Sequence, residues 1–280
     1  MSKFIHQLSQ RFTLASHQIC PRPNFLPSTL RLSTLGLLLS FSLLTFHSCG
    51  LDVEDPTPPS PPVWVQKSLP EEWPERGIDA YESGGIFLEW ETSTEVDIFA
   101  YIIYRAINYN IPDSIIDYQP IVRLEKKTIV NFEYIDNLAI PGLHYLYKII
   151  AEDEAENMSI FSDSIGYSLL PIISPGSMNP NGLNQELPND RILRWGYNYQ
   201  LEMENYLLTI VSANGDLMCR TLFQPQVYTQ WTESWQIPST INFEVDQIYL
   251  WRVDTGAKYV NDRESVGSES HWAYFSYKGI

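Results

Sequence analysis

The chain has 280 residues, a length that allows one or two domains. Its 34 acidic residues outnumber its 18 basic residues, and the resulting net charge of −16 argues against nucleic acid as a partner, because phosphate backbones repel an acidic chain. Its composition, with 44% hydrophobic and 19% charged residues, is typical of a folded protein. The same composition excludes a polytopic membrane protein, a disulfide-rich miniprotein and a coiled coil.

The N-terminal part of the chain, up to Ser48, is typical of a secretory signal peptide. It holds basic side chains at Lys3, Arg11, Arg22 and Arg31 and no acidic one, and residues 32–46 form an uncharged, largely apolar run. A helix needs about 20 apolar residues to span a bilayer, so this run is short for a stable anchor. We therefore predict that residues 1–48 are a signal peptide.

The signal ends in the sequence Phe-His-Ser-Cys-Gly at residues 46–50, which resembles a bacterial lipobox. The resemblance implies that Cys49 becomes the lipid-modified first residue of the mature protein. Two or more acyl chains hold a protein firmly on a membrane, whereas one does so only marginally. The expected location is therefore the cell envelope, as an outer-membrane lipoprotein facing either the periplasm or the medium. The alternative is an ordinary signal peptide that is cut elsewhere.

The cysteine count agrees with this interpretation. Of the three cysteines, Cys20 would leave with the signal and Cys49 would carry lipid, which leaves Cys219. One cysteine cannot form an internal disulfide, so packed cores must supply the stability. Cys219 lies in a strand-like run and is expected to be a small buried or edge side chain.

Residues 49–62 are predicted to be a tether. After the expected lipid site the sequence is acidic and then rich in proline, which favours an extended polyproline II spacer of roughly 3 Å per residue. The acidic cluster Asp52, Glu54 and Asp55 resembles surface-export signals of some Gram-negative lipoproteins. An ordinary solvated tether would look similar.

Beyond the tether, short runs alternate apolar and polar residues and are broken by Pro, Gly, Asn and Asp, which is typical of β-strands. The pattern occurs twice. In each copy a tyrosine follows a tryptophan at the same spacing, and a closely matching Tyr-Leu-aromatic segment comes later at nearly the same distance from that tryptophan. The paired landmarks are Trp90 and Trp195, Tyr101 and Tyr206, and Tyr145 and Tyr249. We therefore predict two homologous domains, residues 63–170 and residues 171–280.

Period-2 alternation places these aromatic residues on inward strand faces, which predicts two packed antiparallel sheets of about 100 residues in each domain. The tryptophan, the tyrosines and the corner Ile140-Pro141-Gly142-Leu143-His144-Tyr145 resemble fibronectin type III domains. The resemblance implies an all-β protein with two tandem immunoglobulin-like sandwiches. It also implies that the Tyr145 hydroxyl bonds to backbone nearby.

The second copy departs from this pattern at its corner. Val245-Asp246-Gln247-Ile248 stands where Pro-Gly is expected, which leaves the construction of that corner open. Residues 171–188, rich in proline and asparagine, are expected to connect the domains and to supply a first edge strand.

The sequence contains few residues or motifs that are typical of catalysis or of metal binding. Phosphate-binding, zinc-protease and nucleophile-elbow motifs are absent, and His144 and His271 are the only histidines beyond the signal. We therefore predict no enzyme, no metal site and no cofactor. The acidic run Glu152, Asp153, Glu154 and Glu156 could bind calcium, although solvated hairpin charges are the preferred interpretation.

Two functional hypotheses remain. The first is a non-catalytic, lipid-anchored envelope protein that binds, adheres to or spaces an unidentified envelope protein. The second is a carbohydrate-binding module in which Trp231 and Trp235 stack on sugar rings. Trp64 and Trp73 also stand outside the core pattern, and all four tryptophans could instead cap the sandwiches or fill the domain junction.

Overall fold

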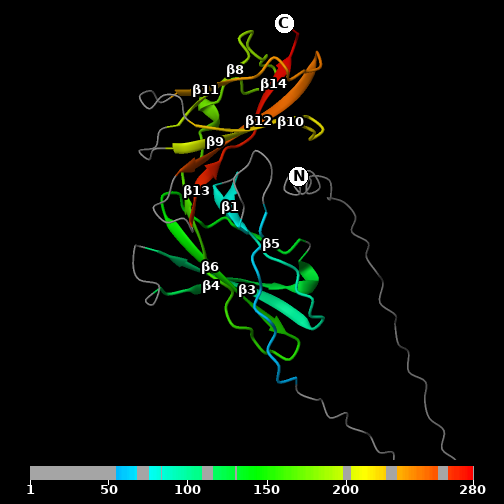
Figure 1. Cartoon of the computed structure of the whole chain (residues 1–280), viewed down its shortest axis with the longest axis vertical. Coiled ribbons are helices and arrows are strands. Elements are labelled where there is room, and N and C mark those ends of the chain that lie inside the picture. The colour runs from blue at the N-terminus through cyan, green and yellow to red at the C-terminus, as the bar shows by residue number, and fades with distance from the viewer. Residues whose placement is uncertain are drawn as a thin grey trace, which may run out of the picture. The chain divides into compact units, whose positions relative to one another are not determined.

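The computed structural model describes residues 55–67, 76–82, 84–108, 116–129, 131–197, 203–224, 232–257 and 264–279. The chain divides into two units, Met1–Asp55 and Pro56–Ile280, and every described strand belongs to the second (Figure 1). Within the described residues, no helix is long and apolar enough to cross a membrane. The predicted signal peptide, the expected lipid site Cys49 and the tryptophans Trp73 and Trp231 lie outside the described residues.

The described elements of the second unit are almost all β-strands, which confirms the predicted all-β class. In chain order the strands are β1 (Ile78–Tyr81), β2 (Gly85–Glu89), β3 (Ile98–Ile107), β4 (Gln119–Glu125), β5 (Glu133–Asp136), β6 (His144–Asp153), β7 (Ile165–Leu169), β8 (Ile192–Gly196), β9 (Met203–Ser212), β10 (Leu217–Phe223), β11 (Thr232–Gln236), β12 (Gln247–Ala257), β13 (Glu264–Glu269) and β14 (Ala273–Tyr277). Within the described residues there are also two short 3-10 turns, η2 (Lys126–Thr128) and η3 (Pro175–Ser177).

Strands β1 to β7 form the first sandwich. Its smaller sheet has the order β1-β2-β5, and its larger sheet runs β7-β6-β3-β4, with antiparallel pairing in both. Alternate side chains of the two sheets meet in one buried cluster that includes Ile86, Leu88, Ile103 and Ile149. These are positions that period-2 alternation places inward.

Strands β8 to β14 form the second sandwich in the same manner. A two-stranded sheet of β8 and β11 packs on a larger sheet in which β12 pairs with both β9 and β14. Its core is a separate buried cluster built around Trp195, Trp251 and Phe275. Leu169 belongs to the first cluster and Leu170 to the second.

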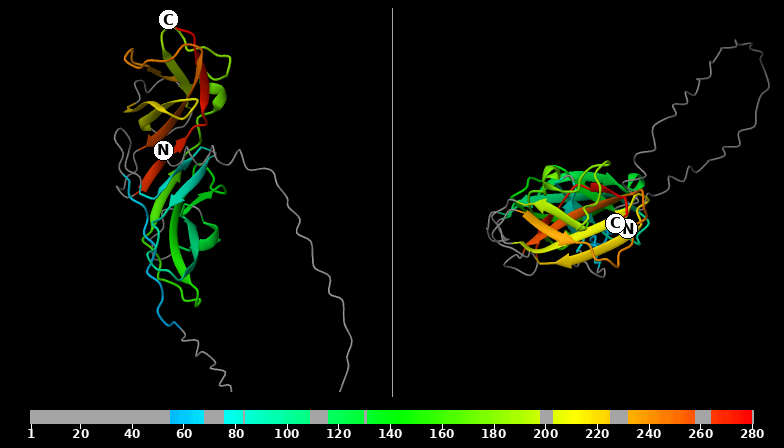
Figure 2. Two further views of the ribbon diagram at one scale, coloured as in Figure 1. Left: turned by 90° about the vertical axis from the view of Figure 1, so that its right-hand side faces the viewer. Right: turned by 90° about the horizontal axis from the view of Figure 1, so that it is seen from above.

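The two larger sheets are continuous. Near its end β12 also pairs with β13, and β13 pairs in parallel with β7 of the first sandwich. The resulting strand order is β10-β9-β12-β13-β7-β6-β3-β4, with β14 attached beside β12. Figure 2 shows these strands from two further directions.

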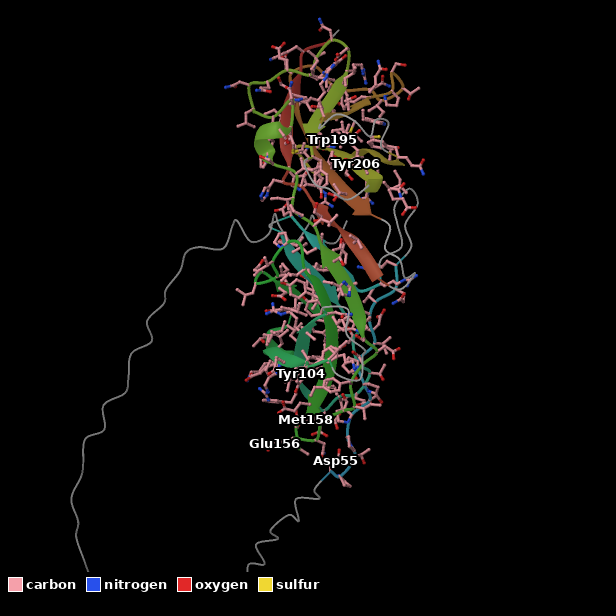
Figure 3. The ribbon with its side chains drawn as sticks, turned by 90° about the vertical axis from the view of Figure 1, so that its left-hand side faces the viewer. Asp55, Tyr104, Glu156, Met158, Trp195 and Tyr206 are labelled. Atoms are coloured by element: carbon pink, nitrogen blue, oxygen red, sulfur yellow. The ribbon has the colours of Figure 1, made fainter. Side chains whose placement is uncertain are left out.

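Corresponding aromatic pairs occupy both cores. The ring centroids of Trp90 and Tyr101 lie 5.5 Å apart, and those of Trp195 and Tyr206 lie 5.4 Å apart (Figure 3). At such separations tilted and edge-on rings attract one another. The equal spacing from tryptophan to tyrosine in the two copies of the sequence pattern therefore corresponds to the same contact made twice.

The tyrosine corner is also built twice. The backbone N–H of Ile140 donates to the Tyr145 hydroxyl at 2.7 Å, and that of Glu244 donates to the Tyr249 hydroxyl at 2.8 Å. Three positions before each tyrosine the backbone is left-handed, with φ of 91° at Gly142 and 63° at Asp246. The second corner thus keeps the geometry of the first without its Pro-Gly sequence.

Part of the predicted tether lies against the first sandwich. Pro59 and Pro62 are buried, and the backbone N–H of Ser60 donates to the Glu95 carboxylate at 3.1 Å. Trp64 is buried too, and its indole N–H donates to the carbonyl of Asp163 at 2.8 Å. The chain is therefore fixed to the sandwich at Ser60 and at Trp64.

Candidate interaction surfaces

Of the two tryptophans predicted to contact a ligand, the described residues include Trp235 on β11. It is half-buried and packs on the core of the second sandwich. Its ring is stacked on Phe223, with centroids 6.5 Å apart and planes at 26°. One face of the indole is thus already covered by the protein.

The residues predicted to be structural are all buried. They are Trp90, Tyr101 and Tyr145 in the first core and Trp195, Tyr206 and Tyr249 in the second. Cys219 lies on β10, half-buried, with its side chain packed against the second core.

The continuous sheet ends in two edge strands, β4 and β10. Among the described residues β4 pairs with β3 alone and β10 with β9 alone, so each presents its other backbone edge outward. Gln119 is exposed on β4, and Leu217 and Leu222 are exposed on β10. Unpaired backbone groups of this kind can accept a further strand.

The charged side chain Arg123 on edge strand β4 is paired with a residue of the same sandwich. Arg123 reaches back to Glu152 on β6 with two hydrogen bonds of 2.8 and 2.6 Å, and this bonding to Glu152 raises the pKa of the arginine. Pro120 lacks a backbone N–H and therefore weakens any pairing at the start of the strand.

The acidic run Glu152, Asp153, Glu154 and Glu156, at the end of β6 and in the turn that follows, contains buried and exposed residues. Glu154 and Glu156 are exposed, whereas Glu152 and Asp153 are buried, so the expectation of uniformly solvated charges is wrong. Asp153 accepts hydrogen bonds from the backbone N–H groups of Ala155 and Asn157 and from the Asn157 amide. It serves to close the turn. Within the described residues no group of three His, Cys, Asp or Glu side chains is placed to hold a metal ion.

An aromatic cluster on the outer face of the first sandwich was not found by sequence reasoning. Tyr104 meets Phe161 edge-on at 5.0 Å, and the ammonium of Lys148 lies 4.5 Å from the Tyr118 ring centre and 5.6 Å from that of Phe161. The register that puts Ile103 inward puts Tyr104 outward opposite Lys148, so strand alternation could have located this cluster. The perpendicular rings and the lysine lying over them leave no flat stacking platform.

The junction between the two sandwiches holds buried charge, which the sequence did not reveal. Arg252 on β12 donates to Glu269 at 2.9 and 3.1 Å and pairs with Asp254 at 3.0 Å. Burial alone would lower the pKa of Arg252, but the two carboxylates outweigh it and raise that pKa. Asp79 and Glu82 of the first sandwich act on Arg252 in the same direction.

Tyr167 on β7 is the neutral member of this junction. Burial raises the pKa of its hydroxyl well above the ordinary value, and the nearby carboxylate of Asp79 adds to the rise. The hydroxyl donates to Asp79 at 3.4 Å, a long hydrogen bond. The lining of this region comes from both sandwiches, with Asp79, Ala80 and Tyr167 from the first and Leu207, Asp254, Thr255, Ser268 and Glu269 from the second.

No protein-family model matches the chain, and no curated protein matches it at a significant level. Among solved structures, it is similar to a β-1,2-glucanase from Parabacteroides distasonis, at 27% identity over 42% of this chain and with a TM-score of 0.30. The match spans 13% of the glucanase.

Other similar structures consist of fibronectin type III domains. The FN1–FN3 domains of chicken CNTN1 are 12% identical, with 79% of this chain and 68% of that chain covered and a TM-score of 0.32. A two-domain segment of chicken tenascin is 10% identical, with 78% and 99% covered and a TM-score of 0.28. Similarity at this level says nothing about function. The chain's own strand order shows two immunoglobulin-like sandwiches of the fibronectin type III kind.

Proposed function

We propose that this chain is a non-catalytic protein of the cell envelope, anchored by lipid on Cys49, which binds a protein partner and holds it at a set distance from the membrane. The observation that carries the proposal is the continuous sheet with an open edge strand at each end, β4 and β10. Such edges bind extended segments of other proteins through backbone hydrogen bonds. Binding and spacing need no further chemistry.

The burial of Pro59 and Pro62 sets the reach of the anchor. Because the chain is held to the sandwich at Ser60, only residues 50–58 remain as a spacer. At roughly 3 Å per residue for polyproline II, that segment reaches about 30 Å at most. The first sandwich would therefore stay close to the lipid surface.

Photo-crosslinking in intact cells tests the partner. A photoreactive amino acid replaces Gln119 on β4, Leu222 on β10 or, as control, Ser239 in an exposed turn of the second sandwich. We expect one dominant protein to crosslink from an edge position and not from Ser239. Equal labelling from all three sites, or recovery of the bait alone from both edges, would overturn the proposed protein partner.

The lipid anchor is tested separately. Labelled palmitate should enter the wild-type chain and be absent from Cys49→Ala, because the lipobox resemblance makes Cys49 the acceptor. Label that persists in the variant would remove the anchor from the proposal and leave the partner result standing.

Glycan binding remains the alternative outcome. If no protein crosslinks, quenching of tryptophan fluorescence by envelope polysaccharide would support it, provided that Trp231→Ala abolishes the quenching. Trp235→Ala is less informative, since the stacking of this ring on Phe223 makes it part of the fold.

A further inference from the structure

The two sandwiches are joined by strand pairing as well as by the connecting chain. Four residues of β13 pair in parallel with β7, from Glu264 opposite Gly166 to Gly267 opposite Leu169. The backbone N–H of Leu170 then donates to the carbonyl of Gly267 at 2.8 Å. The hairpin of β12 and β13 thus extends the sheet of the second sandwich onto that of the first.

Close packing at Gly267 makes this pairing specific. A Cβ added there would lie 2.4 Å from the carbonyl oxygen of Thr255 on β12 and 2.8 Å from the hydroxyl of Tyr167 on β7. Both distances are shorter than any tolerated contact of a methyl group. Glycine at this position therefore lets β13 lie between β12 of the second sandwich and β7 of the first.

Buried charged groups from both halves meet at the junction. Arg252 of the second sandwich is bound by Asp254 and Glu269 of its own strands and is further stabilised by Asp79 of the first. The charged lining of the junction thus comes from both sandwiches, with Asp79 from the first and Asp254 and Glu269 from the second.

The connecting segment itself is not free to act as a hinge. Leu170, Ile173 and Met178 are all buried in the core of the second sandwich. The chain leaves β7 and enters the second core at once, with Leu169 still in the first core. From Leu169 to Ile173 no residue is exposed, so the stretch that passes from one core to the other offers no exposed run over which the two halves could swing.

We propose that the β12–β13 hairpin joins the two sandwiches into one rigid body. This chain is then a spacer of fixed geometry and not a pair of flexibly linked domains. The inference rests on the proposed spacer function and deepens it. A rigid body would present the edges β4 and β10 at a constant separation. Any partner that contacts both edges would then bind without the entropic cost of aligning them.

Distances between spin labels test this rigid connection. Labels are placed at Gln119→Cys on β4 and Leu222→Cys on β10 of the full chain, in a background where Cys20, Cys49 and Cys219 are replaced by alanine. This doubly labelled chain without a further substitution, the parent, should give a single narrow distribution of distances between the two labels. Gly267→Ala should broaden that distribution at least twofold, because the added methyl group forces β13 away from β7 or β12.

Gly176→Ala is the matched control. It makes the same chemical change in the connecting segment, where an added Cβ meets only the Ser174 hydroxyl at 3.8 Å. Its distribution should equal that of the parent. A broad or multiple distribution in the parent, or an unchanged one in folded Gly267→Ala, would overturn the rigid connection. The parent measurement decides alone if Gly267→Ala does not fold, and neither result bears on partner capture at the edges.

Discussion

At the scale of single residues, the two corners show which features of the sequence pattern matter. Gly142 and Asp246 both adopt a left-handed backbone, although aspartate incurs a steric penalty there that glycine does not. Asp246 also pairs with Lys278 at 2.8 Å. The conformation is therefore imposed by the corner, and the residue type only changes how much strain it carries.

Removing either corner hydroxyl should weaken the fold by the same amount. Tyr145→Phe and Tyr249→Phe each delete the acceptor of one backbone N–H, and we expect each to lower the free energy of unfolding by about 1 kcal/mol. Thermal unfolding followed by circular dichroism measures the loss. Tyr104→Phe, which leaves the edge-on contact with Phe161 in place, is the control and should have little effect. A marked difference between the two corners would contradict their equivalence.

Asp153 should make the stability depend on pH. Burial alone would raise its pKa, but the hydrogen bonds donated by Asn157 and Ala155 outweigh burial and hold that pKa below the ordinary value. The ionised form is thus bound more tightly in the folded state. Its contribution is present above about pH 4, the ordinary pKa of aspartate, and is lost as the pH falls through the lower folded pKa.

The measurement is a comparison of the wild type with Asp153→Asn. The difference in melting temperature should be largest near pH 6 and should shrink as the pH falls from 4 towards 2. Glu154→Gln, at an exposed position of the same hairpin, should show no such trend. A difference that grows on acidification would show that Asp153 is not the stabilising anion.

At the scale of elements, a serine lies three residues before the last strand of each sandwich, β7 or β14, and makes the same kind of contact. The Ser162 hydroxyl accepts the backbone N–H of Ile149 on β6, and the Ser270 hydroxyl accepts that of Val253 on β12, both at 3.0 Å. In each case a side chain replaces the backbone partner that the N–H would find in a regular ladder. The two serines thus occupy equivalent positions in the repeat.

Ser162→Ala and Ser270→Ala should each cost about 1–2 kcal/mol, because a buried N–H loses its acceptor. Urea unfolding gives the free energies, and Ser239→Ala in an exposed turn serves as the control. If both variants were as stable as the control, the two serine hydroxyls would contribute nothing to the free energy of unfolding.

The elements also show what the sequence could predict. Strand alternation around Trp90 and Trp195 is local, and the cores could be predicted from it because a side chain's face follows directly from its position in a strand. The pairing of β13 with β7 could not be predicted. Its sequence, Glu-Ser-Val-Gly-Ser-Glu, is mostly polar, and its partner lies far earlier in the chain. The stacking of Trp235 on Phe223 was likewise hidden, since it depends on contact between two different sheets.

At the scale of the whole molecule, charge of one sign dominates. Acidic residues exceed basic ones by 16, and several carboxylates sit together at the junction of the sandwiches. Ion pairs such as Lys278 with Asp246 are exposed and contribute little. Repulsion among the unpaired surface carboxylates should therefore outweigh the attraction within the exposed pairs.

Salt should accordingly stabilise the protein. Raising NaCl from about 20 mM to 500 mM shortens the Debye length from roughly 20 Å to about 4 Å, which screens the long-range repulsion more than the short pairs. We expect the melting temperature at pH 7 to rise by a few degrees, and KCl to give the same rise because the effect is one of ionic strength. At pH 4.5, where fewer carboxylates are ionised, the rise should be smaller. A melting temperature that falls with salt at pH 7 would mean that paired charges, and not net repulsion, govern the electrostatic part of the stability.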